Sequence, residues 1–159
     1  MQAADRSLAK VMPSIDVHAD ANLFSEQDEG ILAADLAAAA LRAEGLEPSP
    51  FLLSKSWVFF HRHPASAVVA GDGSVAAGAV RISVLAPYGR LTPEARAGLI
   101  EQATQIVARV VGDPAQAERT FVLIGETADG GWGLAGRTGA QLVEWAMGQV
   151  AAAGRPEAG

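Results

Sequence analysis

The sequence contains no cysteine, which excludes disulfide bonds, zinc–thiolate sites and thiol nucleophiles. Basic residues are also few: 12 Lys and Arg against 18 Asp and Glu give a formal charge of -6. The basic residues form no run, so we expect no nucleic-acid partner. No segment approaches the roughly 20 apolar residues of a membrane helix, and none near the amino terminus resembles a signal peptide. We therefore expect a cytoplasmic protein with no membrane partner.

The chain has enough apolar material for a folded core. Half of its 159 residues are hydrophobic, which makes global disorder untenable, and the length fits one domain. We expect residues 12–153 to form that single domain. Residues 1–11 are interpreted as an amino-terminal extension or a misassigned start, and residues 154–159 as a flexible tail.

The first half of the domain has the pattern of a β-α-β unit, residues 13–70. Apolar residues alternate along Pro13–Ala19, which is typical of a half-buried strand. Ser25 is a good helix N-cap, and the apolar stripe after it ends at Gly45. The aromatic segment Ser56–His63 is predicted to be the second strand, and Ala67–Ala70 another short one.

The second half repeats this order in residues 79–137. Ala79–Ala86 and Thr120–Gly125 are predicted to be strands. Between them, Thr92 caps a helix that ends at Gly112. A glycine-rich turn or hairpin follows at residues 126–137, and residues 141–153 are predicted to be a final amphipathic helix.

A fixed offset relates the two units. Ser25 precedes Thr92 by 67 positions, and Gly45 precedes Gly112 by the same 67. We therefore predict an α/β fold of tandem β-α-β units that form a four-stranded sheet with two helices on one face. We expect the second unit to run about parallel to the first, and neighbouring subunits to cover the other face of the sheet.

Pro13 follows Met12 at the start of the first strand. As the first residue of a mature chain it would carry a secondary amine with a reference pKa of about 8, which burial and nearby cations would lower. A neutral amine near pH 7 is a good general base, whereas an amide nitrogen is not basic. The alternative interpretation is a proline that simply begins a strand.

Two further segments have the character of a binding site. Arg90 lies beyond the carboxyl end of a predicted strand, where α/β sheets commonly bind ligands, and a guanidinium suits a carboxylate. Trp132 lies among the four glycines of the segment Gly130–Gly136 and is either an aromatic wall of a pocket or a turn residue that packs on a neighbour. A solvent-exposed arginine is the alternative for Arg90.

The three histidines suggest a different chemistry. His61 and His63 alternate onto one strand face, and His18 shares a face of the first strand with Asp16. Three imidazoles could bind zinc or iron, so a metal-dependent enzyme is one alternative. Our main expectation is a protein with no metal and no cofactor.

Together, Met12-Pro13, the segment Tyr88–Glu94 and the glycine-rich segment around Trp132 resemble the tautomerase superfamily, in its two-unit form. Its members include 4-oxalocrotonate tautomerase, malonate semialdehyde decarboxylase and macrophage migration inhibitory factor. The resemblance runs to about Arg137, and the segment His61–Pro64 is most similar to the decarboxylase branch. It implies the tautomerase-like fold and a homotrimer.

The resemblance also implies roles for individual residues. Pro13 matches the catalytic amino-terminal proline, although it is internal in this sequence. Arg90 matches a carboxylate-binding arginine, with Tyr88 two residues before it. The position of a second such arginine is occupied by Phe121, and Arg119 lies two residues earlier, expected on the same strand face. The remaining match is Trp132, which corresponds to an aromatic residue that lines the pocket.

The expected function is that of an enzyme acting on a small 2-oxo or unsaturated carboxylic acid, with Pro13 as general base or acid. The reaction is keto–enol tautomerisation, or decarboxylation or hydration of a similar acid. The alternative is a non-catalytic trimeric binding or scaffold protein of the same fold, in which the extension blocks Pro13.

Overall fold

The structure is a computed structural model and describes residues 12–154. The predicted extension, residues 1–11, and residues 155–159 of the predicted tail lie outside the described part. The helices and strands follow in the order β1 (Ser14–Asp20), α2 (Glu26–Ala43), α3 (Pro50–Lys55), β2 (Val58–His63), η1 (Ala65–Ala67), β3 (Val80–Ala86), α4 (Pro93–Val111), η2 (Pro114–Arg119), β4 (Thr120–Glu126), β5 (Gly133–Leu134), β6 (Arg137–Thr138) and α5 (Gly139–Ala153).

Helix α2 begins and ends where its capping residues predict. The Ser25 hydroxyl accepts a hydrogen bond from the backbone of Asp28, whose carboxylate accepts one from the backbone of Ser25 in return. This capping box satisfies two amide groups that the first helical turn leaves without partners. The chain leaves the helix through Gly45, whose φ of 79° is in the left-handed region that favours glycine.

Helix α4 follows the same design. Thr92 accepts a hydrogen bond from the backbone of Ala95, and Pro93 occupies the first turn, where its missing N–H costs nothing. The helix ends at Gly112, whose φ is also 79°. The two caps and the two terminating glycines confirm the 67-residue offset as a structural repeat.

The strands form one four-stranded sheet in the order β2-β1-β3-β4. Within each unit the two strands are parallel, but β1 and β3, which join the units, are antiparallel. The expectation that the second unit runs about parallel to the first is therefore wrong. The carboxyl end of β2 and the start of β3 lie at the same end of the strands. The antiparallel arrangement therefore needs only a connection across that end, whereas a parallel one would need a segment that runs back along the full length of the strands.

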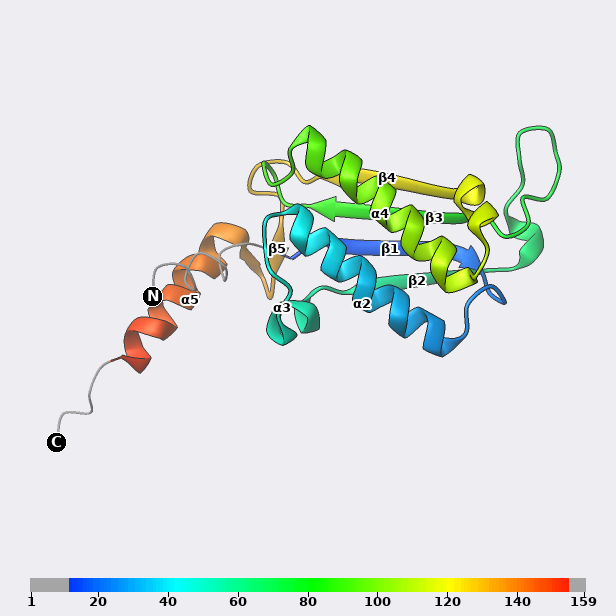
Figure 1. Cartoon of the computed structure of the whole chain (residues 1–159). Coiled ribbons are helices and arrows are strands. Elements are labelled where there is room, and N and C mark those ends of the chain that lie inside the picture. Colours follow the sequence, from blue (N-terminus) through cyan, green and yellow to red (C-terminus); the bar gives the residue numbers. More distant parts are fainter. Residues whose placement is uncertain (1–11, 155–159) are drawn as a thin grey trace.

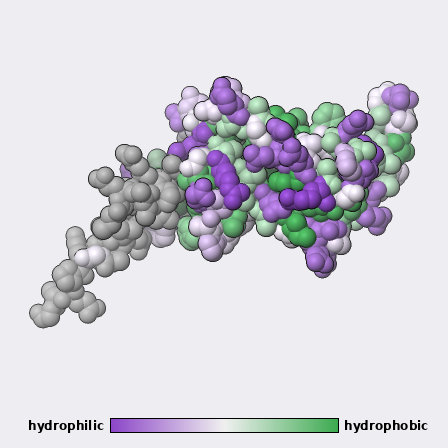
Figure 2. All heavy atoms as spheres, viewed as in Figure 1, coloured by the Kyte–Doolittle hydropathy of each residue, from purple (hydrophilic) through white to green (hydrophobic). Residues whose placement is uncertain are grey.

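Both long helices lie on the same face of the sheet, as predicted, and pack against each other (Figure 1). The core between the layers combines the alternating residues of the strands with the apolar stripes of the helices. Its fully buried members include Ile15, Val17, Leu32, Leu36, Val80, Ile82, Ala103 and Val107. Polar groups spread over the outer side of the helices (Figure 2). Among them, Arg109 of α4 pairs with Asp35 of α2.

The opposite face of the sheet has no covering layer within the described chain. Phe59, Leu85, Phe121 and Leu123 point to this side and are 44–72% exposed. An exposed apolar surface of this kind is typical of a protein–protein interface. Residues 12–154 contain no helix that is both long and apolar enough to cross a membrane.

Several segments differ from the prediction. Ala65–Ala67 form a short 3-10 helix where a strand was expected at 67–70, and only an isolated bridge joins Val69 to Val75. The helices α3 and η2 were not predicted, because six residues are too few to show a periodic apolar pattern. The final helix begins at Gly139, two residues before its expected start.

Candidate active site

Pro13 is buried immediately before β1. The antiparallel register pairs Ser14 with Leu85, so Pro13 lies beside the carboxyl end of β3. It borders a cavity of about 190 Å³ that Lys55, Trp57 and Trp132 also line. In the described chain the Pro13 nitrogen is joined to Met12 and is therefore an amide, without a basic lone pair.

Arg90 and Tyr88 belong to the loop between β3 and α4, at the same edge of the sheet. Arg90 is half-buried, whereas Tyr88 is 60% exposed. Both line a second cavity of about 340 Å³, and Trp132 forms part of its wall too. The structure therefore brings Pro13, Trp132, Arg90 and Tyr88 to one edge of the sheet, with the indole common to both cavities.

Glu126, the last residue of β4, shapes the loop that carries Arg90. Its carboxylate accepts hydrogen bonds from the backbone of Gly89 and of Leu91, both 3.2 Å long. Arg96 pairs with the same carboxylate at 3.1 Å. The hydrogen bonds from Gly89 and then Leu91 lower the pKa of Glu126, so the carboxylate remains charged and holds the loop at neutral pH. The sequence analysis did not assign it this role.

A second carboxyl group, that of Glu44, lies within the electrostatic field of Arg90. Glu44 is only 7% exposed, and neither of its oxygens has a hydrogen-bond partner among the described residues. Burial raises its pKa to about 8, while Arg90 opposes this rise and Glu126 adds to it. Glu44 is therefore protonated at neutral pH. It caps α2, a position at which nothing in the sequence distinguishes it from a surface residue.

The glycines around Trp132 are required by close backbone approaches. A Cβ at Gly131 would lie 2.9 Å from the carbonyl oxygen of Ala128, and one at Gly133 would lie 2.8 Å from that of Arg137. The Trp132 carbonyl accepts a hydrogen bond from Gly139, at the start of α5. The segment is thus a tight hairpin, and the Trp132 that it carries lines both cavities described above.

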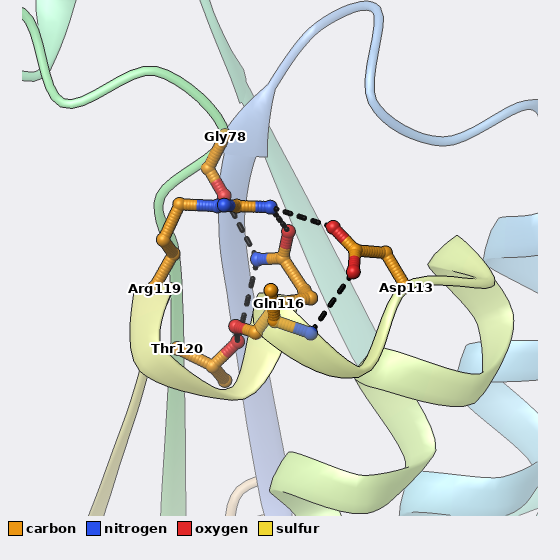
Figure 3. Close-up of polar contacts among 6 residues, drawn as sticks. Gly78, Asp113, Gln116, Arg119 and Thr120 are labelled. Carbon is orange, nitrogen blue, oxygen red and sulfur yellow. Dashed lines mark hydrogen bonds and ion pairs between the residues drawn. The ribbon is translucent and has the colours of Figure 1, made fainter.

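Arg119 lies at the opposite end of the sheet from Pro13. It ends η2 rather than sharing a strand with Phe121, and Thr120 pairs with Val80 at the start of β3, about 20 Å of strand away from Glu126. Its guanidinium donates to Asp113 at 3.3 Å and to Gln116 at 3.2 Å (Figure 3). Within one chain, Arg119 is therefore separated from the site at Pro13.

Phe121 is separated from the site as well. It is 72% exposed on the open face of the sheet, where its neighbour on β3 is Arg81. An aromatic side chain this exposed has no pocket to line within one chain. Both Arg119 and Phe121 remain candidates only for a site that a neighbouring subunit completes.

Lys55 is a cation at the site that the sequence analysis missed. It ends α3, and the backbone of Ile15 donates to the carbonyl of Trp57, which brings the start of β2 beside the start of β1. Lys55 thereby enters the wall of the Pro13 cavity. Lys55 could have been found from its position directly before β2, which runs parallel to the Pro13 strand β1. The sequence analysis missed it because helix α3, which ends at Lys55, was not predicted.

The three histidines come together on the open face, further along β1. His18 stacks on His61 with ring centroids 4.0 Å apart, and its Nδ1 lies 2.9 Å from Nε2 of His63. Asp16 contacts His61 at 2.6 Å. Burial, then the neighbouring His61 and Arg81, lower the pKa of His18 below its ordinary 6.5. His18 is therefore neutral at pH 7.

Comparison with known proteins identifies a matching family model and similar structures. Residues 80–140 match the family model described as "Tautomerase enzyme", which spans β3 to the first residues of α5. No curated protein matches the chain.

Solved structures resemble nearly all of the described chain. A fused 4-OT asymmetric trimer has a TM-score of 0.66 at 22% identity, over 81% of this chain and 98% of that one. N1, a member of the cis-3-chloroacrylic acid dehalogenase family, has 0.67 at 23% identity, over 91% and 93%. Leishmania major MIF2 has 0.60 at 19% identity, over 81% and 98%.

These likenesses show a tautomerase-like β-α-β fold. The sequence predicted this fold, and its second unit matches the tautomerase family model.

Proposed function

We propose that the protein is a tautomerase-type enzyme that acts on a small 2-oxo or unsaturated carboxylic acid, with Pro13 as its general base once the nitrogen is free. The observation that carries the proposal is the common edge of the sheet at which Pro13, Trp132 and Arg90 meet. A mature chain that begins at Pro13 would place a secondary amine in the cavity lined by Lys55.

The local charges suit proton transfer by that amine. An α-amino group has an ordinary pKa of about 8, and burial beside the Lys55 ammonium lowers it, because both disfavour the charged form. The neutral amine would take the proton of the substrate enol, and the resulting ammonium would deliver a proton to carbon. The product is the keto tautomer, and the amine is regenerated without any other reactant.

Arg90 and Lys55 supply the positive charge that a carboxylate substrate needs. Arg90 is half-buried in a loop fixed by Glu126, so its guanidinium is partly positioned before the substrate arrives. Trp132, between the two cavities, would shield the reacting atoms from water. Tautomerisation is the simplest reaction this arrangement supports. Decarboxylation or hydration of a similar acid uses the same groups.

The decisive experiment compares two forms of the chain. One is expressed from Met12, with intact mass confirming that Pro13 is the first residue, and the other is the full chain. Ketonisation of a small aryl enolpyruvate, followed by ultraviolet absorbance, should be fast with the first form and at least about 100-fold slower with the second and with Pro13→Ala. Equal activity of all three would overturn the proline mechanism.

Arg90→Ala in the active form tests substrate binding. We expect KM to rise at least about 10-fold, with partial recovery in Arg90→Lys, because the charge returns without the bidentate geometry. Arg109→Ala is the matched control, since Arg109 is an exposed arginine on the helix side of the molecule. A rise of KM in the control equal to that in Arg90→Ala would contradict the proposed role.

A non-catalytic scaffold is the second candidate, because the Pro13 nitrogen is an amide in the described chain. Intact mass of protein from the native host separates the two: a chain that begins at Pro13 supports the enzyme, and one that keeps residues 1–12 supports the scaffold. For either candidate we propose a homotrimer and a cytoplasmic location. The exposed apolar face of the sheet and the trimers described for fused 4-OT support the trimer.

A further inference from the structure

All three histidines of the chain gather on the open face of the sheet, although they come from two strands that are far apart in sequence. The parallel register places His18 directly opposite His61 and Asp20 opposite His63. Asp16, two residues before His18, projects from the same side of β1. Imidazole nitrogens and a carboxylate therefore share one small area of a half-exposed surface.

The donor atoms of Asp16, His18 and His61 lie within 4.8 Å of one another. Bonds of 2.0–2.1 Å in a tetrahedral zinc site place neighbouring ligand atoms ~3.4 Å apart. Binding of one ion would therefore draw these atoms together by about an ångström, and it would turn the His18 and His61 rings out of their parallel stack so that both nitrogens face the ion. Within one chain, His61 and the Asp16 carboxylate are each roughly two-fifths exposed and have room for this movement. The proposed trimer would cover this face of the sheet, so the ion would then lie close to a neighbouring subunit.

We propose that Asp16, His18 and His61 form a binding site for a divalent transition-metal ion, with zinc the ion that their donor atoms suit best. Two imidazoles and one carboxylate are a ligand set that zinc takes readily, and a fourth position remains for water. The proposal is separate from the chemistry at Pro13, which lies about 10 Å before Asp16 along β1.

His63 has a separate place in this arrangement. Its Nε2 contacts Nδ1 of His18 at 2.9 Å. This contact occupies one nitrogen of the His18 ring and leaves the other, Nε2, for a metal ion. Partners of this kind fix the orientation of the ligand and tune its affinity. His63 is therefore an orienting residue rather than a ligand.

The surrounding charges are balanced enough for a cation. Arg81 lies opposite His18 on β3 and opposes binding, whereas the carboxylates of Asp16 and Asp20 on β1 favour it. Without an ion, the contact between Asp16 and His61 and that between His18 and His63 satisfy these groups as hydrogen bonds. A hydrogen-bonded network alone is the competing interpretation.

The test uses the full chain without a histidine tag, after treatment with chelator. Titration with zinc chloride in a calorimeter should show one ion per chain, and cobalt(II) should give the visible absorption of a tetrahedral complex. Asp16→Asn and His61→Gln should each weaken binding by at least about 100-fold, and His63→Gln by about 10-fold. Asp35→Asn, which removes the same charge from the helix side, should bind as the wild type does.

Absence of zinc and cobalt binding to the wild-type chain would overturn the proposal. Binding that survives unchanged in Asp16→Asn and His61→Gln would overturn it as well, because the ion would then be held elsewhere. Circular dichroism and melting of each metal-free variant establish which ones are folded, and His18→Gln replaces any variant that is not.

Discussion

Buried Glu44 should make the protein less stable as the pH rises from about 5 to 8. The carboxyl is 7% exposed, and within the described chain its oxygens have no hydrogen-bond partner. Burial raises its pKa from 4.5 to about 8, so the folded chain keeps this proton over a range in which the unfolded chain releases it. Folding in this range therefore requires the uptake of a proton, and the free energy of unfolding falls as the pH rises.

The size of the effect follows from the two pKa values. Each pH unit between them costs 1.36 kcal/mol, so the total by pH 8 is on the order of 4–5 kcal/mol. Glu44→Gln keeps the shape of the protonated group but cannot ionise. Its stability should equal that of the wild type near pH 5 and exceed it increasingly towards pH 8, where the difference levels off.

Urea unfolding followed by tryptophan fluorescence, at one protein concentration and at pH 5, 6, 7 and 8, measures this difference. The comparison with Glu44→Gln cancels the contributions of the other titratable groups, which the two proteins share. Glu47→Gln is the matched control, because Glu47 is exposed three residues further on, and its difference from wild type should not vary with pH. A constant difference between Glu44→Gln and wild type would refute the reasoning.

Four other substitutions test the fold and its surfaces. Leu36→Ala removes a side chain that is 2% exposed and should cost about 2–5 kcal/mol in urea unfolding. Gly112→Ala forces a Cβ into a φ of 79° without a clash and should cost about 1 kcal/mol, again by urea unfolding. Because the pKa of Glu126 is lowered in the folded chain, its ionised carboxylate stabilises the fold fully at neutral pH, and this stabilisation is lost on acidification below about 4.5. In Glu126→Gln, the free energy of unfolding should therefore fall less between pH 6 and 3 than it does in the wild type. Phe121→Asp should convert the proposed trimer to monomers in light scattering, and an unchanged trimer would show that this face is not the interface.

The elements most easily predicted from sequence were those with local physical causes. Ser25 and Thr92 fix their helix starts by hydrogen bonds within one turn, and Gly45 and Gly112 end the helices by a backbone conformation that few other residues adopt. Such signals lie within a few residues of the element they define, so they can be read without knowing the rest of the fold.

The relative direction of the two units could not be read in this way. It depends on where β2 ends relative to β3, which is a property of the assembled sheet. The same limit applies to the site. Arg119 lies only two residues before Phe121 in sequence, yet it ends η2 and its guanidinium binds Gln116 instead. Lys55 shows no motif, and only the pairing of β1 with β2 brings it to Pro13.

The antiparallel junction between β1 and β3 gives the two units an approximate twofold relation, so their strand ends lie at opposite edges of the sheet. Each edge is thus a copy of the other in backbone but not in side chains: the counterpart of Pro13 is the buried Val80, and the counterpart of Arg90 is Leu23. A protein assembled from identical single units would carry every substitution at all of its sites at once. Covalent duplication frees this chain from that constraint, because one edge can retain its chemistry while the other accumulates changes that serve only stability or association.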